Sequence, residues 1–166
     1  MCDERTESTD DAMNPMPIDP DTPASRPLHL QFGALALVFV GGVAGTGLRY
    51  LIEEVFPIVG TGWPWATFAV NIAGAFILGA LLEVLALAGP DNGWRRTVRV
   101  FAGTGFCGAF TTYSTFALET AQLGHHGASV TALAYAVVSV LVGLASAWVG
   151  IVVAGVAVRR RGGEVS

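Results

Sequence analysis

The residues best suited to bind an ion or to take part in chemistry form a short hydroxyl-rich run inside an otherwise apolar stretch of the chain. Glycines at positions 103, 105 and 108 precede it, and residues 111–115 read Thr-Thr-Tyr-Ser-Thr. Glycine weakens a helix, and Ser and Thr hydroxyls offer the backbone competing partners, so this pattern favours a broken helix. A break would free carbonyl groups for a cation and N–H groups for an anion. The alternative is close helix packing through small residues.

Side chains within and after this run have the spacing of two helix faces. Tyr113 and Phe116 are three residues apart and share one face. Thr112, Thr115 and Glu119 share a neighbouring face. Aromatic rings present a positive edge, and ring edges with hydroxyl donors suit an anion that has lost its water. On spacing alone, an aromatic pair more often belongs to plain helix core.

Glu119 is the only acid well inside this apolar region. A buried acid of this kind is either a proton-coupling group or a hydrogen-bond acceptor for backbone or hydroxyl groups. His125 and His126 lie in a glycine-flanked connection and are expected at the surface, since no matching ligand set accompanies them. The sequence contains neither a nucleophile–base pair nor a phosphate-binding glycine loop, so we do not expect an enzyme.

An asparagine interrupts the second apolar stretch of the chain. Thr67, Asn71 and Gly74 line one face of the helix expected there. An amide in the middle of a membrane segment must be hydrogen-bonded, so this face should meet other helices or a cavity. Asn71 therefore either bonds a neighbouring helix or offers its donors to an ion.

The first and fourth apolar stretches carry small and polar residues at helical spacing. Gly41 and Gly45 form a GxxxG pair, which permits close backbone approach. Arg49, one turn further on, either snorkels to the membrane interface or steers anions at a vestibule. A stripe on the fourth stretch should face protein or a pore, and it comprises Tyr135, Ser139, Gly143, Ser146 and Gly150.

Four long apolar stretches determine the expected fold class. The 166-residue chain is 52% hydrophobic and only 13% charged, which argues against a soluble enzyme surface. The stretches cover about residues 28–52, 55–82, 100–118 and 128–158, with the second helix starting near Trp65. A bilayer core of about 30 Å needs about 20 apolar residues per helix, so we predict an all-α membrane protein with four transmembrane helices, the third of them broken.

Charge divides the chain into three expected parts. Of the net charge of −4, residues 1–27 carry −5 and the remainder carries +1. Residues 1–27 are predicted to be a disordered acidic tail, residues 28–158 the membrane domain, and residues 159–166 a basic tail. Four crossings place eight of the nine arginines on one side, so the positive-inside rule predicts that both termini are cytoplasmic. The protein should lie in the cell membrane, with the lipid bilayer and no nucleic acid as partner.

Three motifs in order carry a resemblance to a known family. They are Gly41-Gly42-x-x-Gly45-x-x-x-Arg49-Tyr50, Val70-Asn71-x-x-Gly74, and Gly105-Phe-Cys-Gly108-x-x-Thr111-Thr-Tyr-Ser-Thr-Phe116-x-x-Glu119. With four short helices, this pattern closely resembles the CrcB/Fluc family of fluoride channels over about residues 32–157. The resemblance implies an antiparallel dimer with two pores through which cytoplasmic fluoride leaves passively, relieving its toxicity.

The resemblance also implies roles for individual residues. A structural sodium ion would be held at the helix break by the backbone carbonyls of Gly108 and Thr111. Fluoride would pass along ring edges, an amide and hydroxyl groups, which correspond to Tyr113, Phe116, Asn71, Ser114 and Thr115. Glu119 matches the family's glutamate, and Tyr135 and Ser139 resemble the polar residues of its fourth helix. The first aromatic of the family is usually Phe, so Tyr113 adds a hydroxyl to the track.

The uneven distribution of arginines between the two sides of the membrane indicates which kind of subunit could be the partner. Family homodimers insert in both orientations and carry weak bias, whereas the bias here is strong. We therefore expect either a homodimer or a heterodimer with a second family subunit of opposite orientation.

Two other functions remain open from the residues. A proton-coupled small multidrug-type exporter has four helices but needs an acid in its first helix, which has none between Leu28 and Leu51. A non-transporting membrane scaffold would require the third stretch to serve packing alone.

Overall fold

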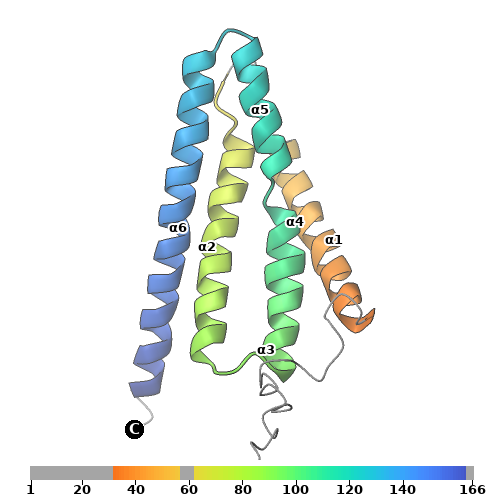
Figure 1. Cartoon of the computed structure of the whole chain (residues 1–166), viewed down its shortest axis with the longest axis vertical. Coiled ribbons are helices and arrows are strands. Elements are labelled where there is room, and N and C mark those ends of the chain that lie inside the picture. Colours follow the sequence, from red (N-terminus) through yellow and green to blue (C-terminus); the bar gives the residue numbers. More distant parts are fainter. Residues whose placement is uncertain (1–31, 57–61, 164–166) are drawn as a thin grey trace, which may run out of the picture.

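The structure, a computed structural model, describes residues 32–56 and 62–163, and the acidic tail expected over residues 1–27 lies outside these ranges. The described residues form a bundle of helices (Figure 1). The elements in chain order are α1 (Phe32–Val55), α2 (Trp65–Leu87), α3 (Gly93–Val98), the π-helix η2 (Arg99–Cys107), α4 (Gly108–Phe110), α5 (Tyr113–His125) and α6 (Ser129–Gly163).

These elements make four crossings. α1 and the composite α3–α5 run in one direction, and α2 and α6 run in the other (Figure 1). α1, α2 and α6 are each long and apolar enough to span a bilayer. The 23 residues of α2, for example, extend about 35 Å at about 1.5 Å per residue. The remaining crossing is divided between α4 and α5, so the predicted four-helix fold with a broken third crossing is confirmed.

The third crossing begins earlier than the apolar pattern indicates. Residues 89–99 read as a connection, yet the helix starts at Gly93. Arg95 explains the early start, because its Nε donates to the carbonyl of Pro90 at 2.7 Å and its Nη1 to that of Ala88 at 2.9 Å. These bonds satisfy carbonyl groups at the end of α2 and draw α3 against it. A charged residue thus belongs to the helix although hydropathy assigns it to a loop.

Close backbone contacts hold α1 against the third crossing. A Cβ on Gly41 would meet the carbonyl oxygen of Phe101, and a Cβ on Gly45 would meet that of Phe106. Both glycines of the GxxxG pair therefore lie directly against the backbone of η2. α2 and α6 are also held together by a close glycine contact, since a Cβ on Gly79 would meet the carbonyl oxygen of Ala147.

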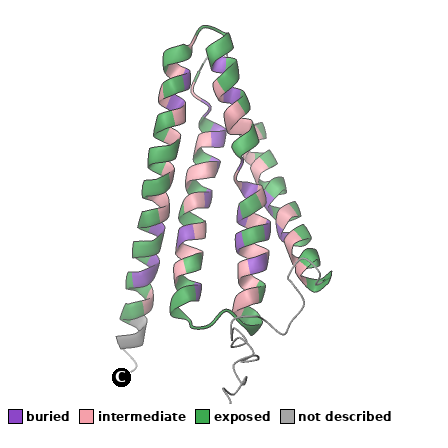
Figure 2. Ribbon diagram, in the orientation of Figure 1, coloured by how far each residue is buried: buried purple, intermediate pink, exposed green. Residues whose placement is uncertain are grey.

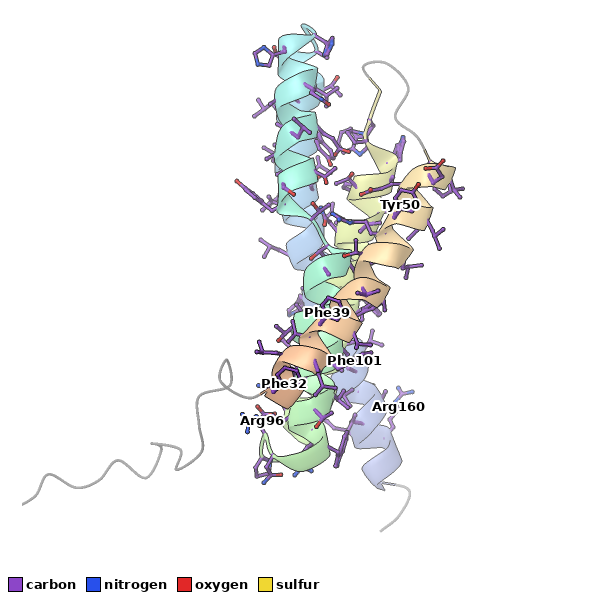
Figure 3. The ribbon with its side chains drawn as sticks, turned by 90° about the vertical axis from the view of Figure 1, so that its right-hand side faces the viewer. Phe32, Phe39, Tyr50, Arg96, Phe101 and Arg160 are labelled. Carbon is purple, nitrogen blue, oxygen red and sulfur yellow. The ribbon has the colours of Figure 1, made fainter. Side chains whose placement is uncertain are left out.

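Buried residues gather on the inward faces of the helices, and the outward faces are exposed and apolar (Figure 2). Phe32, Phe39 and Phe101 mark this pattern along α1 and η2 (Figure 3): Phe32 and Phe39 are 87% and 72% exposed, whereas Phe101 is partly buried. Apolar surface of this extent requires lipid or another protein to cover it. The fold is that of a multi-pass membrane protein.

Alanine at Gly45 should destabilise the protein, because the added methyl group would overlap the carbonyl of Phe106. Overpacking of this kind costs about 1–3 kcal/mol. Gly47→Ala on the same helix is the matched control, since a Cβ there meets no atom within 4 Å. Thermal unfolding in detergent should show a lower Tm for Gly45→Ala only, and equal Tm values for both variants would contradict the contact.

Candidate functional site

The break in the third crossing lies at two extended residues. Thr111 has φ −78° and ψ 156°, and Thr112 has φ −144° and ψ 122°, so neither continues the helix. Non-helical backbone at membrane depth requires partners for its polar groups from elsewhere in the protein. The site is built from the residues that supply those partners.

Asn71 of α2 holds the break in place. Its Oδ1 accepts the N–H of Thr112 at 2.8 Å, and its Nδ2 donates to the carbonyl of Thr112 at 3.0 Å. One amide side chain therefore satisfies both backbone groups of one residue. Gly74, three residues further along the same face, leaves room for the side chain of Thr111. This face of α2 therefore contacts the third crossing, and the amide of Asn71 retains one N–H beyond these bonds.

Thr112 also caps the helix that follows. Its Oγ1 accepts the N–H of Thr115 at 3.1 Å and donates to Thr115 Oγ1 at 3.0 Å, and Ser114 Oγ lies 3.3 Å away. A Thr side chain in this position is a standard N-cap. α5 therefore begins inside the membrane domain with the positive end of its dipole directed at the break.

Two carbonyl groups at the break lose their helical donors. In a continuous helix the N–H groups of Thr112 and Thr115 would reach the carbonyls of Gly108 and Thr111. Here those N–H groups bond Asn71 and Thr112 instead. The described residues contain no group of three or more His, Cys, Asp or Glu side chains suited to a metal ion. Any cation at this point would be bound by carbonyl oxygens, which suit hard cations.

A groove of about 380 Å³ runs beside the break and opens on the surface of the subunit. Asn71, Thr112, Tyr113, Phe116 and Ser139 contribute to its lining. The rings of Tyr113 and Phe116 lie 6.1 Å apart at 45°, and Tyr113 is 81% exposed. Among the described residues, Ser139 Oγ is buried without a hydrogen-bond partner. The groove thus combines two aromatic rings with hydroxyl and amide groups.

A buried carboxylate lies behind this groove. Glu119 Oε1 accepts a hydrogen bond from Thr67 Oγ1 at 2.7 Å, and Oε2 accepts one from the Tyr135 hydroxyl at 2.8 Å. All three residues are buried, Tyr135 completely. The ring of Tyr135 packs 5.2 Å from that of Phe116 and edge-on to that of Trp63 at 5.4 Å. The sequence left two roles open for Glu119, a proton-coupling group and a hydrogen-bond acceptor. In the structure Glu119 accepts two hydrogen bonds.

The structure brings together most of the residues selected from sequence but not all of them. Arg49 lies apart from the groove, with its Nε 3.9 Å from Glu53 Oε1. Tyr135 belongs to the Glu119 cluster rather than to the groove lining. Sequence reasoning missed the contact of Thr67 with Glu119 and the packing of Trp63 on Tyr135. The contact of Thr67 with Glu119 could have been found from spacing, because Thr67 lies four residues before Asn71 and so on the same helix face.

The fold and the site define a small multi-pass helical membrane protein with a groove at a broken helix, lined by apolar residues and a few hydroxyl and amide side chains. The CrcB-like protein family (Camphor Resistance, CrcB) matches residues 36–151. The fluoride-specific ion channel FluC 1 of Cutibacterium acnes is 46% identical over 115 residues, covering 69% of this chain and 80% of the relative. The fluoride-specific ion channel FluC 2 of Leifsonia xyli subsp. xyli is 45% identical over 139 residues, covering 84% and 95%. The chain therefore belongs to the CrcB/FluC family of fluoride-specific ion channels and not to a family of enzymes.

Asn71→Ala should loosen the break, because both backbone groups of Thr112 would lose their partner. Amide hydrogen exchange measured by mass spectrometry should accelerate across residues 111–115. Ser146→Ala is the matched control, since it removes a 2.9 Å hydrogen bond to the carbonyl of Ile72, the residue next to Asn71. Equal exchange at the break in both variants would show that Asn71 does not hold it.

Glu119→Ala should destabilise the bundle more than Glu119→Gln. Alanine leaves two buried hydroxyl groups unpaired, at a cost of about 1–3 kcal/mol each, whereas glutamine retains hydrogen-bonding capacity at both positions. Chemical unfolding in detergent measures the difference. The network contributes nothing if the two variants unfold at the same denaturant concentration.

Proposed function

We propose that this chain is the subunit of a fluoride-selective channel that lets cytoplasmic fluoride leave the cell passively. The proposal rests on the groove at the helix break, which is lined by two aromatic rings together with hydroxyl and amide side chains. A small anion that leaves water needs donors to replace its hydration shell. The names of the relatives give that anion as fluoride.

The proposed ion track follows the groove. Tyr113 and Phe116 would direct their positive ring edges at the ion, and Ser139 would donate from its unpaired hydroxyl. Asn71 would contribute its remaining N–H while its other atoms hold the break. The hydroxyls of Ser114 and Thr115, beside the cap residue, would extend the set of donors.

Glu119 and Arg49 have supporting roles in this proposal. Glu119 would support the track from behind, because it accepts the hydroxyls of Thr67 and Tyr135 and so holds the ring of Tyr135 against that of Phe116. A negative charge on Glu119 would repel the anion, so the proposed path stays in the groove and does not reach this buried cluster. Arg49, at the far end of α1 from Phe32, would attract anions toward a vestibule.

A second subunit would complete the path. The groove opens on the subunit surface, and Tyr113 is 81% exposed at a depth where only lipid or protein can cover it. We propose an antiparallel dimer, formed either with a second copy or with a second family subunit of opposite orientation. Structural sodium would be held where the two breaks meet, by the carbonyls of Gly108 and Thr111, whose helical donors are engaged elsewhere. The ion would neutralise the partial charges of those carbonyls.

The orientation follows from the charges at the two ends of the bundle. Six arginines of the described helices lie at the end that also holds the first residue of α1 and the last of α6, and Arg49 lies at the other end. We propose a cell-membrane location with both termini cytoplasmic. The functional domain would then be residues 28–158, flanked by the acidic tail of residues 1–27 and the basic tail of residues 159–166.

Fluoride efflux from liposomes containing the purified chain tests the function. We expect fluoride to leave rapidly and chloride to be retained, without a pH gradient. A proton-coupled exporter would require the gradient, and a scaffold would pass neither ion. Efflux from vesicles made with this chain alone would also favour the homodimer, whereas efflux that needs a second family subunit would favour the heterodimer.

Tyr113→Phe should conduct fluoride within a few-fold of the original rate, because the ring edge rather than the hydroxyl faces the ion. Tyr113→Ala should lose most of the flux, since it removes the edge. Both rates are measured by fluoride electrode at matched protein content per vesicle. Loss of flux in Tyr113→Phe would instead assign the ion contact to the hydroxyl.

A further inference from the structure

One end of the bundle is strongly basic. Arg95, Arg96 and Arg99 reach it from the third crossing, and Arg159 and Arg160 from the last turns of α6. Figure 3 shows Arg96 and Arg160 at this end, on different elements and on opposite sides of the bundle. The positive charge therefore forms a rim rather than a single compact pocket.

The arginines of the third crossing already have local partners. Arg95 donates to the carbonyls of Pro90 and Ala88 and to Asn92 Oδ1 at 3.2 Å. Arg99 Nε lies 3.4 Å from Asp91 Oδ1. These guanidinium groups serve the connection between α2 and α3.

The arginines of α6 are placed differently. Arg159 and Arg160 are exposed, and neither has a hydrogen bond or ion pair with another residue in the described part of the chain. The helix that carries them has an exposed apolar surface immediately before them, with Val152, Val153 and Val156 between 42% and 51% exposed. Acyl chains that cover these valines would bring lipid headgroups level with the two guanidinium groups.

We propose that Arg159 and Arg160 bind the phosphodiester headgroup of anionic phospholipids. A guanidinium presents a planar fork of donors that matches phosphate oxygens in a bidentate arrangement. Trp94 is 61% exposed at the same end, with the guanidinium of Arg95 5.8 Å from its ring centre, which is a typical interfacial arrangement. Charge complementarity and the continuous apolar surface of α6 together favour a lipid over a free anion.

Lipid binding to the full-length chain can be measured directly by native mass spectrometry in detergent. Dimyristoyl-phosphatidylglycerol is titrated against the original chain and against the double variant Arg159→Gln/Arg160→Gln. Each arginine near an anionic surface contributes a factor of about five in affinity, so the variant should bind the first lipid at least roughly tenfold more weakly. Arg159→Lys/Arg160→Lys is the matched control: it keeps both charges but lacks the bidentate fork, so its affinity should lie between those of the original chain and the glutamine variant. Phosphatidylcholine, which has no net charge, should bind all three proteins more weakly than phosphatidylglycerol binds the original chain.

Three outcomes would overturn the proposal. Unchanged phosphatidylglycerol binding by the glutamine variant would exclude these arginines. Displacement of the lipid by millimolar ammonium phosphate would assign the site to a free anion. Roughly tenfold stronger lipid binding after replacing Asp10, Asp11, Asp19 and Asp21 by asparagine would mean that the acidic tail of this chain occupies the arginines instead. None of these measurements depends on fluoride transport.

Discussion

The pair of hydrogen bonds between Asn71 and the backbone of Thr112 is the constraint on which the rest of the site depends. A helix broken within the membrane domain must find other partners for its exposed amide groups, since lipid offers none. One asparagine supplies both partners for Thr112. It fixes Thr112, whose side chain caps α5. The carbonyls of Gly108 and Thr111 are left without their helical donors, because the N–H of Thr112 bonds Asn71 and that of Thr115 bonds Thr112.

α2 carries this constraint because one of its faces meets the third crossing on three successive turns. Thr67 bonds Glu119, Asn71 bonds Thr112, and Gly74 makes room for Thr111. Glycine contacts on the neighbouring helices fix the distances at which these bonds form. Gly41 and Gly45 seat α1 against η2, so the half of the third crossing before the break is held from one side while α2 holds the break from the other.

Much of this arrangement could be predicted from sequence because it depends on local chemistry. Four apolar stretches predict four crossings, Pro64 before Trp65 marks the start of α2, and the GxxxG spacing indicates close packing. The start of the third crossing at Gly93 was not predictable, since it depends on the bonds of Arg95 to the end of α2. The link from Tyr135 to Glu119 was missed because it joins residues on two different helices.

The groove places two aromatic rings and the unpaired hydroxyl of Ser139 beside the point where the helix is interrupted. In the proposed function, Asn71 shapes the ion path by holding the break. Fluoride efflux from liposomes containing Asn71→Ala or Ser146→Ala at equal protein content tests this most directly. We expect the flux to fall at least roughly a hundredfold in Asn71→Ala, as for loss of a shaping contact worth about 3 kcal/mol, and to stay near the original rate in Ser146→Ala. Equal flux through the two variants would contradict it.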